Sequence, residues 1–341
     1  MMKKVLTLTL LIIAIGTLSG MYPEAQAASY QRSSSDDTFG IGLGYLTGNT
    51  LYHISAYDAT GGIESELEFP LKTLLLGLEY SYIGRNARGQ DALKIGIRWS
   101  FNKVGSFNID NGSGKLKDSD WLTDNFDIEA PPSPPNPPNS GFPHPGLDIY
   151  SESDIDLKAT IIDLRASYGF WPSARISLGP LGGLLYQNFQ YDASNVRQVG
   201  FGPWASGATG SFSGKVLTYE VTYIIPYLGI HSGMLVSKNF QAFLDLGYSP
   251  WASAEDRDDH ILRRKTSQAK TTGYAYLVTI TAQWDIKDND FFLVRGQYLE
   301  VNTTGPQTQT FYDGSGDVIT GINDKITSQQ TSLSFSFIHR F

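Results

Sequence analysis

The sequence predicts an all-β protein, namely a transmembrane antiparallel β-barrel of ten strands with long extracellular loops. Three observations predict this fold. Apolar and polar side chains alternate over segments long enough to cross a membrane as tilted strands. Aromatic residues lie near the ends of those segments, where the two membrane interfaces are expected. The chain ends in another alternating segment, residues 333–341, whose last residue is Phe341.

Residues 274–286 show the alternation most clearly, with tyrosine, valine, isoleucine and tryptophan on one face. A soluble β-sandwich also buries one face of each strand, so alternation alone does not exclude it. The final segment favours the barrel, because it is similar to the signal that outer-membrane barrels present to their assembly machinery. The predicted inward faces also carry charges of both signs, which suit a polar lumen closed by ion pairs: Lys94, Arg98, Asp163, Arg165, Asp285 and Arg295.

Ten segments are predicted to be strands, at residues 38–57, 64–84, 91–102, 152–170, 175–192, 215–236, 239–255, 272–287, 290–302 and 329–341. An even number places both ends of the chain on the periplasmic side. The longest connections, 103–150 and 193–214, then face outward, where function usually resides. The first holds a proline-rich stretch, residues 130–145, which is interpreted as a stiff spacer. A closed barrel leaves no strand edge, so a monomer is expected.

The N-terminal residues predict export. Residues 1–27 combine a short basic start, an apolar run too short to span a bilayer and a cleavage pattern ending at Ala27, so they are interpreted as a cleaved signal peptide. Residues 28–341 would then form a single outer-membrane barrel domain. The formal net charge of −8 argues against nucleic acid as a partner. The lack of cysteine excludes disulfides and thiolate zinc sites.

Two short motifs carry side chains that can perform hydrolysis. Asp118 and Asp120 stand two apart in the first long connection, and Asp258 and His260 stand two apart in the acidic stretch "DRDDH". Residues i and i+2 of an extended strand share a face, so each hairpin can direct one pair toward a common groove at the barrel mouth. Neighbouring carboxylates share a proton. A carboxylate beside an imidazole orients the ring as a base for a water molecule.

These motifs also have plainer interpretations. Asp-x-Asp and Asp-x-His occur in solvated loops, and the same side chains bind divalent metal ions. No metal site is predicted, because the stretch offers one histidine and the chain has no cysteine. Asp259 would lie on the opposite face from Asp258 and His260 and is interpreted as a solvated residue.

At these residues the sequence resembles the omptins, a family of ten-stranded outer-membrane proteases of Gram-negative bacteria. "GYLTGNT" at 44–50 looks like the family's first-strand motif, and "PYLGI" at 226–230 like the start of its sixth strand. "DSDW" at 118–121 matches its Asp-x-Asp-Trp catalytic segment. "GYSPWASAEDRDDH" at 247–260 resembles the segment that ends in its Asp-x-His motif. The similarity covers most of the chain after residue 27, and both catalytic segments occur in the family's order.

The resemblance implies the roles of four residues. Asp118 and Asp120 would be the paired aspartates, and Asp258 and His260 the Asp–His dyad. His260 and Asp118 would flank the attacking water, while Asp258 orients His260 and Asp120 shares charge or a proton with Asp118. The implied reaction is endopeptide hydrolysis, in a groove that faces outward from the outer membrane.

Two departures from the family pattern concern binding. The family's acidic pocket selects a basic residue before the cleaved bond. Asp256 matches one of its two acids, but Tyr52 stands at the position of the other, so a weaker preference for basic residues is expected. The family also binds lipopolysaccharide on its outer wall. Tyr186 matches that set, whereas Asn188 and Gln190 replace charged members, so a requirement for lipopolysaccharide is left open and no other cofactor is expected.

The leading hypothesis is therefore a surface endopeptidase that cleaves peptides or proteins near basic residues, held in outer-membrane lipid. Two alternatives stay open. One is a barrel whose extracellular loops serve adhesion or binding, and the other is a channel, which the charged lumen and modest strand number disfavour. The basic run 263–265 beside the Asp–His motif suggests a self-cleavage site. Its alternative interpretation is that these side chains face anionic lipid headgroups.

Overall fold

The computed structural model of the protein describes residues 35–57, 61–87, 89–124, 149–170, 173, 175–201, 209–287 and 289–341. All regular elements in these residues are β-strands. No helix in this part of the chain is long and apolar enough to cross a membrane. The predicted signal peptide, residues 1–27, and the proline-rich stretch, residues 130–145, lie outside the described residues.

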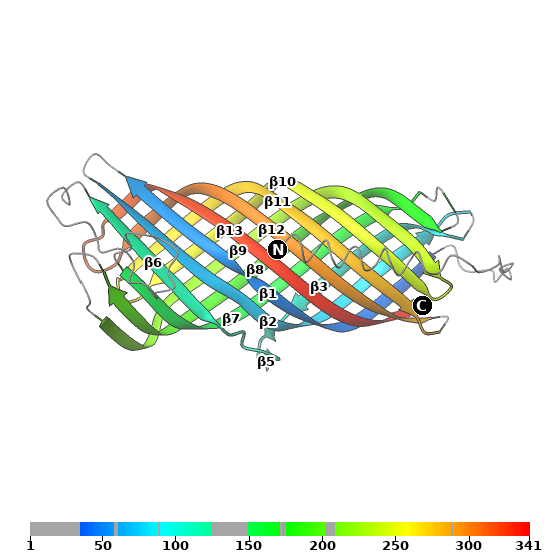
Figure 1. The fold of residues 1–341 in the computed structure, drawn as a ribbon, viewed down its shortest axis with the longest axis horizontal. Coiled ribbons are helices and arrows are strands. Elements are labelled where there is room, and N and C mark those ends of the chain that lie inside the picture. Colours follow the sequence, from blue (N-terminus) through cyan, green and yellow to red (C-terminus); the bar gives the residue numbers. More distant parts are fainter. Residues whose placement is uncertain are drawn as a thin grey trace.

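The strands follow one another, antiparallel, around a closed barrel (Figure 1). The first strand pairs with both the second and the last, which closes the sheet. The elements are β1 (Ser35–Tyr57), β2 (Gly61–Arg85), β3 (Asp91–Phe101), β4 (Lys103–Val104), β5 (Phe107–Asn108), β6 (Lys115–Asp124), β7 (Ile149–Tyr168), β8 (Ile176–Gly200), β9 (Thr209–Ser237), β10 (Phe240–His260), β11 (Lys265–Asp285), β12 (Asp290–Phe311) and β13 (Val318–Arg340).

β3 and β6 are two successive segments of one barrel strand. β3 lies between β2 and β7 toward one end of the barrel, and β6 takes the same place between them toward the other end. Between the two segments the chain leaves the wall and forms the small hairpin β4–β5, at the lower edge of Figure 1. With β3 and β6 taken together, ten strands surround the barrel, and the predicted fold is confirmed.

The alternation of side chains builds an apolar band on the outer surface. Along β11 the residues from Tyr274 to Trp284 alternate between outward and inward, as predicted. Such a surface is unfavourable in water and stable in lipid, so this band marks the membrane-spanning part of the barrel. Its exposed side chains include Phe39, Ile41, Leu43, Tyr45, Tyr80, Tyr82, Ile95, Ile97, Tyr168, Leu228, Ile230, Tyr248, Trp251, Tyr276, Phe335 and Phe337.

Short turns close the end of the barrel at which β1 begins and β13 ends, where the backbone amide of Phe341 donates to the carbonyl oxygen of Asp37 at 2.8 Å. The opposite end, where β6 lies, is on the left of Figure 1. This outer end carries the longer connections.

The strands at the outer end are longer than the sequence predicted. β8 and β9 take up most of the predicted loop 193–214, and β6 lies within the predicted loop 103–150. β10, β11, β12 and β13 also extend beyond their predicted outer ends. The physical reason is that both faces of a strand meet water or polar groups above the membrane, so the period-two contrast that reveals a strand weakens there.

Inside the apolar band, charged side chains fill the lumen in pairs. Nη1 of Arg165 lies 3.0 Å from Oδ2 of Asp245, and the same guanidinium also pairs with Asp163. Nη2 of Arg295 lies 2.9 Å from Oε2 of Glu79. Each of these three carboxylates thus has a partner of opposite sign, as burial requires. The predicted lumen with charges of both signs is confirmed.

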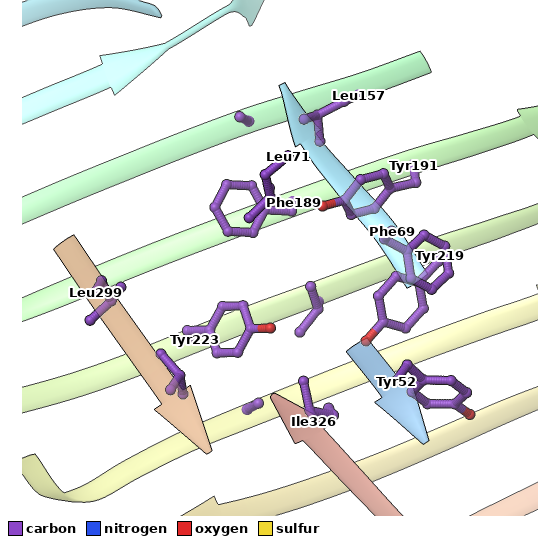
Figure 2. Close-up of a cluster of buried hydrophobic side chains, with 14 of the residues drawn as sticks. Tyr52, Phe69, Leu71, Leu157, Phe189, Tyr191, Tyr219, Tyr223, Leu299 and Ile326 are labelled. Atoms are coloured by element: carbon purple, nitrogen blue, oxygen red, sulfur yellow. The ribbon is translucent and has the colours of Figure 1, made fainter. Parts of the chain in front are cut away.

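An apolar layer lies between these ion pairs and the outer end. Figure 2 shows its aromatic members, among them Tyr52 on β1, Phe69 on β2, and Tyr191 and Tyr219 on β8 and β9. The ring centroids of Phe69 and Tyr219 are 4.2 Å apart, and those of Tyr52 and Tyr219 are 5.5 Å apart. This layer fills the lumen, which argues against the channel alternative, and it forms an apolar floor beneath the barrel mouth.

Candidate active site

β6 and β10 carry the two predicted pairs near their outer ends. Asp118 and Asp120 lie on β6, and Asp258 and His260 are the last inward-facing residues of β10. Asp120 is 6 % exposed and Asp258 is fully buried, whereas Arg257 between the inward residues is exposed. The two-residue spacing therefore directs each pair into the mouth, as predicted.

Asp258 and His260 are in close contact, within ion-pair distance. Nε2 of His260 lies 2.6 Å from Oδ2 of Asp258. Ladder pairing with β9 on one side and β11 on the other fixes both residues in place. Because Asp258 occupies Nε2, the second ring nitrogen, Nδ1, is the one available to a water molecule or a substrate.

Arg263 connects the two pairs across the mouth. It lies in the turn 261–264 that joins β10 to β11, and its Nη2 is 3.3 Å from Oδ2 of Asp120 on β6. β6 is bordered by β2 and β7, whereas β10 is bordered by β9 and β11, so this contact spans the barrel. The charge of the neighbouring Lys265 also acts on both pairs. The structure thus brings together the four residues predicted for catalysis.

The two aspartates of β6 differ in their surroundings. Burial and the charge of Asp120 raise the pKa of Asp118 to about 8, against the opposing effect of Arg263. Oδ2 of Asp118 accepts a long hydrogen bond of 3.5 Å from the Ser151 hydroxyl, and Oδ1 has no hydrogen-bond partner among the described residues. Asp118 therefore holds a proton at neutral pH while Asp120 is paired with Arg263.

Asp256 and Tyr52 lie deeper in the mouth than the dyad. Asp256 precedes Asp258 by two residues on the same face of β10 and is 5 % exposed. Tyr52 on β1 is 1 % exposed, and its hydroxyl accepts a hydrogen bond from Nε2 of Gln307. Burial and the charges of nearby carboxylates, first of all Asp258, raise the pKa of Tyr52, so this side chain remains neutral.

Asp324 is a buried residue of the mouth that the sequence analysis missed. It lies on β13, is 0 % exposed, and accepts a hydrogen bond of 3.3 Å from the same Nε2 of Gln307 that contacts Tyr52. Its charge acts on Asp256. No pattern in the sequence marked it, because Asp324 falls between two predicted strands, in a segment where the alternation is weak.

Two interpretations of the acidic and basic stretch need correction. Arg263 faces Asp120 and Lys265 is only 8 % exposed, so the interpretation of these two side chains as lipid-facing is wrong. Asp259 faces away from the dyad as predicted, but it is more than a solvated residue, because the hydroxyl of Tyr312 donates to its Oδ1 at 2.7 Å.

Tyr186 lies on β8, and Asn188 and Gln190 follow it at alternate positions of the same strand. The side-chain amides of Asn188 and Gln190 donate to one oxygen, Oε1 of Glu220, at 2.8 and 3.0 Å. The surface beside Tyr186 thus carries one carboxylate, that of Glu220, and the two neutral amides bonded to it. A role of Tyr186 in binding lipid stays a prediction. Within the described ranges, no group of three or more histidine, cysteine, aspartate or glutamate side chains is arranged to hold a metal ion.

Comparison with known proteins agrees with this fold and chain length. The family model described as the omptin family matches residues 34–341. The plasminogen activator of Yersinia pestis is 26 % identical over 344 residues, which cover 95 % of this chain and 97 % of that protein. The crystal structure of the outer membrane protease OmpT from Escherichia coli has the same fold, with a TM-score of 0.68 at 16 % identity, over 93 % of this chain and 99 % of that one. The chain therefore belongs to the omptin family and is a protease of the Gram-negative outer membrane.

Proposed function

We propose that this protein is an endopeptidase that cleaves proteins or peptides at the cell surface near basic residues, through water activated by the Asp258–His260 dyad, with the Asp118–Asp120 pair acting on the carbonyl group that the water attacks. One observation carries the proposal. The two pairs stand far apart in the sequence, yet they meet at the outer mouth, where Arg263 contacts Asp120 across the barrel. The related protein of Yersinia pestis is named a plasminogen activator, which is consistent with a protein substrate.

The dyad supplies the base. With Nε2 of His260 held by Asp258, Nδ1 accepts a proton from the attacking water as the water oxygen bonds to the carbonyl carbon. Asp258 stabilises the imidazolium that forms. The imidazolium then gives this proton to the amide nitrogen, the carbon–nitrogen bond breaks, and a carboxylic acid and an amine are released.

The aspartate pair acts on the other side of the substrate. Burial and the charge of Asp120 favour the protonated form of Asp118, whose hydroxyl can donate a hydrogen bond to the carbonyl oxygen as negative charge develops there. Asp120 is instead within ion-pair distance of Arg263. In this arrangement Asp118 acts as a hydrogen-bond donor, and Asp120 holds the contact with Arg263 across the barrel.

The substrate is expected to carry a basic residue because the mouth is acidic. Asp256 is buried beside the dyad, and no described side chain donates to its carboxylate oxygens. An arginine or lysine side chain of the substrate would supply that missing donor. The protein is expected to work as a monomer in outer-membrane lipid, since the closed barrel leaves no strand edge. The same cleavage assays, run with and without lipopolysaccharide, test whether activity requires this lipid.

The test compares two histidine variants in membrane-inserted protein. His260→Ala is expected to lower kcat/KM for peptides with one or two basic residues by about a hundredfold or more, the usual contribution of a general base. His339→Ala is the matched control, because Nδ1 of His339 also pairs with an aspartate, Asp290, at 2.8 Å, but at the opposite end of the barrel. This control is expected to cleave like the wild type.

Equal cleavage by wild type and His260→Ala would contradict the proposed role of the dyad. Cleavage by neither would contradict the protease proposal and favour a barrel that binds or adheres through its loops. A chelator is added in a parallel assay. The proposed mechanism predicts that activity survives the chelator, and loss of activity would point to a metal-dependent reaction instead.

A further inference from the structure

The side chain of Tyr52 cannot supply negative charge to the mouth. Its hydroxyl is an acceptor for Gln307, and burial together with the charge of Asp258 raises its pKa. Tyr52 also packs its ring against Tyr219 in the apolar floor (Figure 2). A basic side chain that enters the mouth therefore needs a second carboxylate from another position.

Asp324 offers that carboxylate from the neighbouring strand. Ile326 on β13 stands opposite Tyr52 on β1, and Asp324 lies two residues nearer the outer end on the same face. Gln307 Nε2 contacts both the Tyr52 hydroxyl and Oδ2 of Asp324, so one amide holds the two groups side by side. Oδ1 of Asp324, which is fully buried, has no hydrogen-bond partner among the described residues.

Asp256 and Asp324 lack a cation. Among the described residues no lysine, arginine or histidine lies within ion-pair distance of either carboxylate, and neither oxygen of Asp256 accepts a hydrogen bond from a side chain. Two such buried carboxylates resist ionisation together unless a positive charge joins them. Their open oxygens are therefore complementary to a cation with several N–H donors.

We propose that Asp256 and Asp324 together bind the guanidinium or ammonium group of a substrate's basic side chain, with Asp324 as the specificity-determining acid in place of Tyr52. This inference rests on the proposed protease function. Gln307 holds Asp324 in place through its amide, and Gln309 in turn donates to Oε1 of Gln307 at 2.9 Å. A basic side chain fits the site better than a metal ion, since no three-ligand group is found within the described residues.

Binding of a cation to Asp256 and Asp324 is also expected to release protons. Burial and the charges of Asp324 and Asp258 raise the pKa of Asp256, and burial and the charge of Asp258 raise the pKa of Asp324. Both carboxyls are therefore largely protonated in mildly acidic solution, and an arriving guanidinium favours their ionised forms. The other ionisable groups that face the pair are Asp258 on β10, Tyr52 on β1, Tyr219 on β9 and, beyond Gln309, Lys265 on β11.

The first experiment measures kcat/KM for two peptides that differ only in arginine or citrulline before the cleaved bond. Asp324→Asn is expected to lower the arginine-to-citrulline ratio about tenfold or more, through loss of one charge-assisted contact. Asp324→Glu is expected to retain much of the preference, because it keeps the charge. Asp317→Asn is the matched control, since Asp317 is an exposed residue of the connection before β13, and its ratio is expected to equal that of the wild type.

The outcomes separate this inference from the protease proposal. If the wild type cleaves neither peptide, the protease proposal fails. If the wild type cleaves and Asp324→Asn keeps the wild-type ratio, the role of Asp324 is wrong while the protease proposal stands.

A second measurement needs no variant and covers the case in which Asp324→Asn does not fold. Agmatine, which carries a guanidinium group, is titrated into the wild-type protein near pH 6 in buffers of different ionisation enthalpy. Release of more than one proton per agmatine bound is expected if both carboxyls ionise. Release of one proton or fewer, or the absence of binding, would overturn the proposal. Calcium and magnesium chloride are titrated in the same way. If either metal ion binds more tightly than agmatine, the pair is assigned to a metal ion and the proposal is overturned.

Discussion

The inside of this barrel holds two sets of acidic residues, and they differ in what neutralises them. Within the membrane band, Asp163 and Asp245 share Arg165, and Glu79 is paired with Arg295. The tyrosine hydroxyl of Tyr227 also donates to Asp163 at 3.0 Å, so the hydrogen-bonding capacity of that carboxylate is used by the protein itself. Each of these three carboxylates in the membrane part of the lumen therefore has a cation that the protein itself supplies.

At the outer mouth the acidic residues outnumber their partners. Asp118, Asp256, Asp258 and Asp324 gather above the apolar floor, and each has at least one oxygen without a hydrogen-bond partner in the described part of the chain. Carboxylates buried in this way lower stability, because their charged forms are poorly solvated. The difference teaches that the carboxylates of the membrane part of the lumen are paired with cations of the protein, whereas the mouth leaves carboxylate oxygens open, which we propose serve a water molecule and a basic substrate.

The largest expected effect of a single change concerns the mouth. Asp118→Asn keeps the shape of the side chain but removes the carboxyl hydroxyl that is proposed to bond the carbonyl oxygen. We expect kcat/KM to fall by about 10³-fold, within the range found for oxyanion donors and acid–base groups. Steady-state cleavage of a basic peptide by membrane-inserted protein measures this, and a loss below about tenfold would remove Asp118 from the mechanism.

The corresponding change in the membrane part of the lumen should affect stability instead. Arg165→Leu leaves Asp163 and Asp245 without their shared cation and is expected to cost roughly 3–5 kcal/mol in the free energy of unfolding. Denaturant unfolding in detergent or lipid measures the loss, with Lys238→Ala in an exposed turn as control. The fraction that remains folded should cleave peptides with unchanged kcat. A free energy of unfolding equal to that of the wild type would contradict the stabilising role of Arg165 and its two aspartates.

A moderate effect is expected in the pH dependence. Activity that needs protonated Asp118 is present below its raised pKa, near 8, and is lost as the pH rises through that value. Arg263 lowers this pKa, so Arg263→Met should raise the pKa further and move the alkaline limb of the kcat profile to higher pH. An alkaline limb that moves to lower pH in this variant would mean that the ionised form of Asp118 is the active one.

The smallest effect is expected at Tyr52. Tyr52→Phe removes a neutral hydroxyl that accepts one hydrogen bond from Gln307 and leaves the ring in its place against Tyr219. Since a hydrogen bond between neutral groups contributes about 1 kcal/mol, kcat/KM for an arginine peptide should change by less than about tenfold. A much larger loss would show that the hydroxyl itself takes part in binding the substrate.

The sequence was sufficient to predict the barrel and the common faces of the two proposed catalytic pairs, for a physical reason. In the membrane, one face of each strand must be apolar, so the alternation along residues 274–286 is strong and reveals the strand. The spacing of Asp118 and Asp120, and of Asp258 and His260, fixes their common face as soon as they lie on strands.

What the sequence could not predict depends on contacts between strands that are distant in the chain. The upper parts of β8 and β9 have little contrast between their faces, so they were assigned to a loop. Asp324 and Gln307 lie on similarly polar upper strands, and their importance appears only when β12, β13 and β1 stand side by side. The contact between Arg263 and Asp120 likewise requires the closed barrel.

The most direct test of the central claim compares two Asp–His pairs of the same length within one protein. His260 Nε2 lies 2.6 Å from Asp258 at the mouth, and His231 Nδ1 lies 2.6 Å from Asp245 in the lumen. The measurement is kcat/KM of Asp258→Asn and Asp245→Asn, each corrected for the folded fraction. The predicted result is a loss of about 10³-fold for Asp258→Asn and wild-type activity for Asp245→Asn. Equal activity of the two variants would contradict the assignment of catalysis to the mouth.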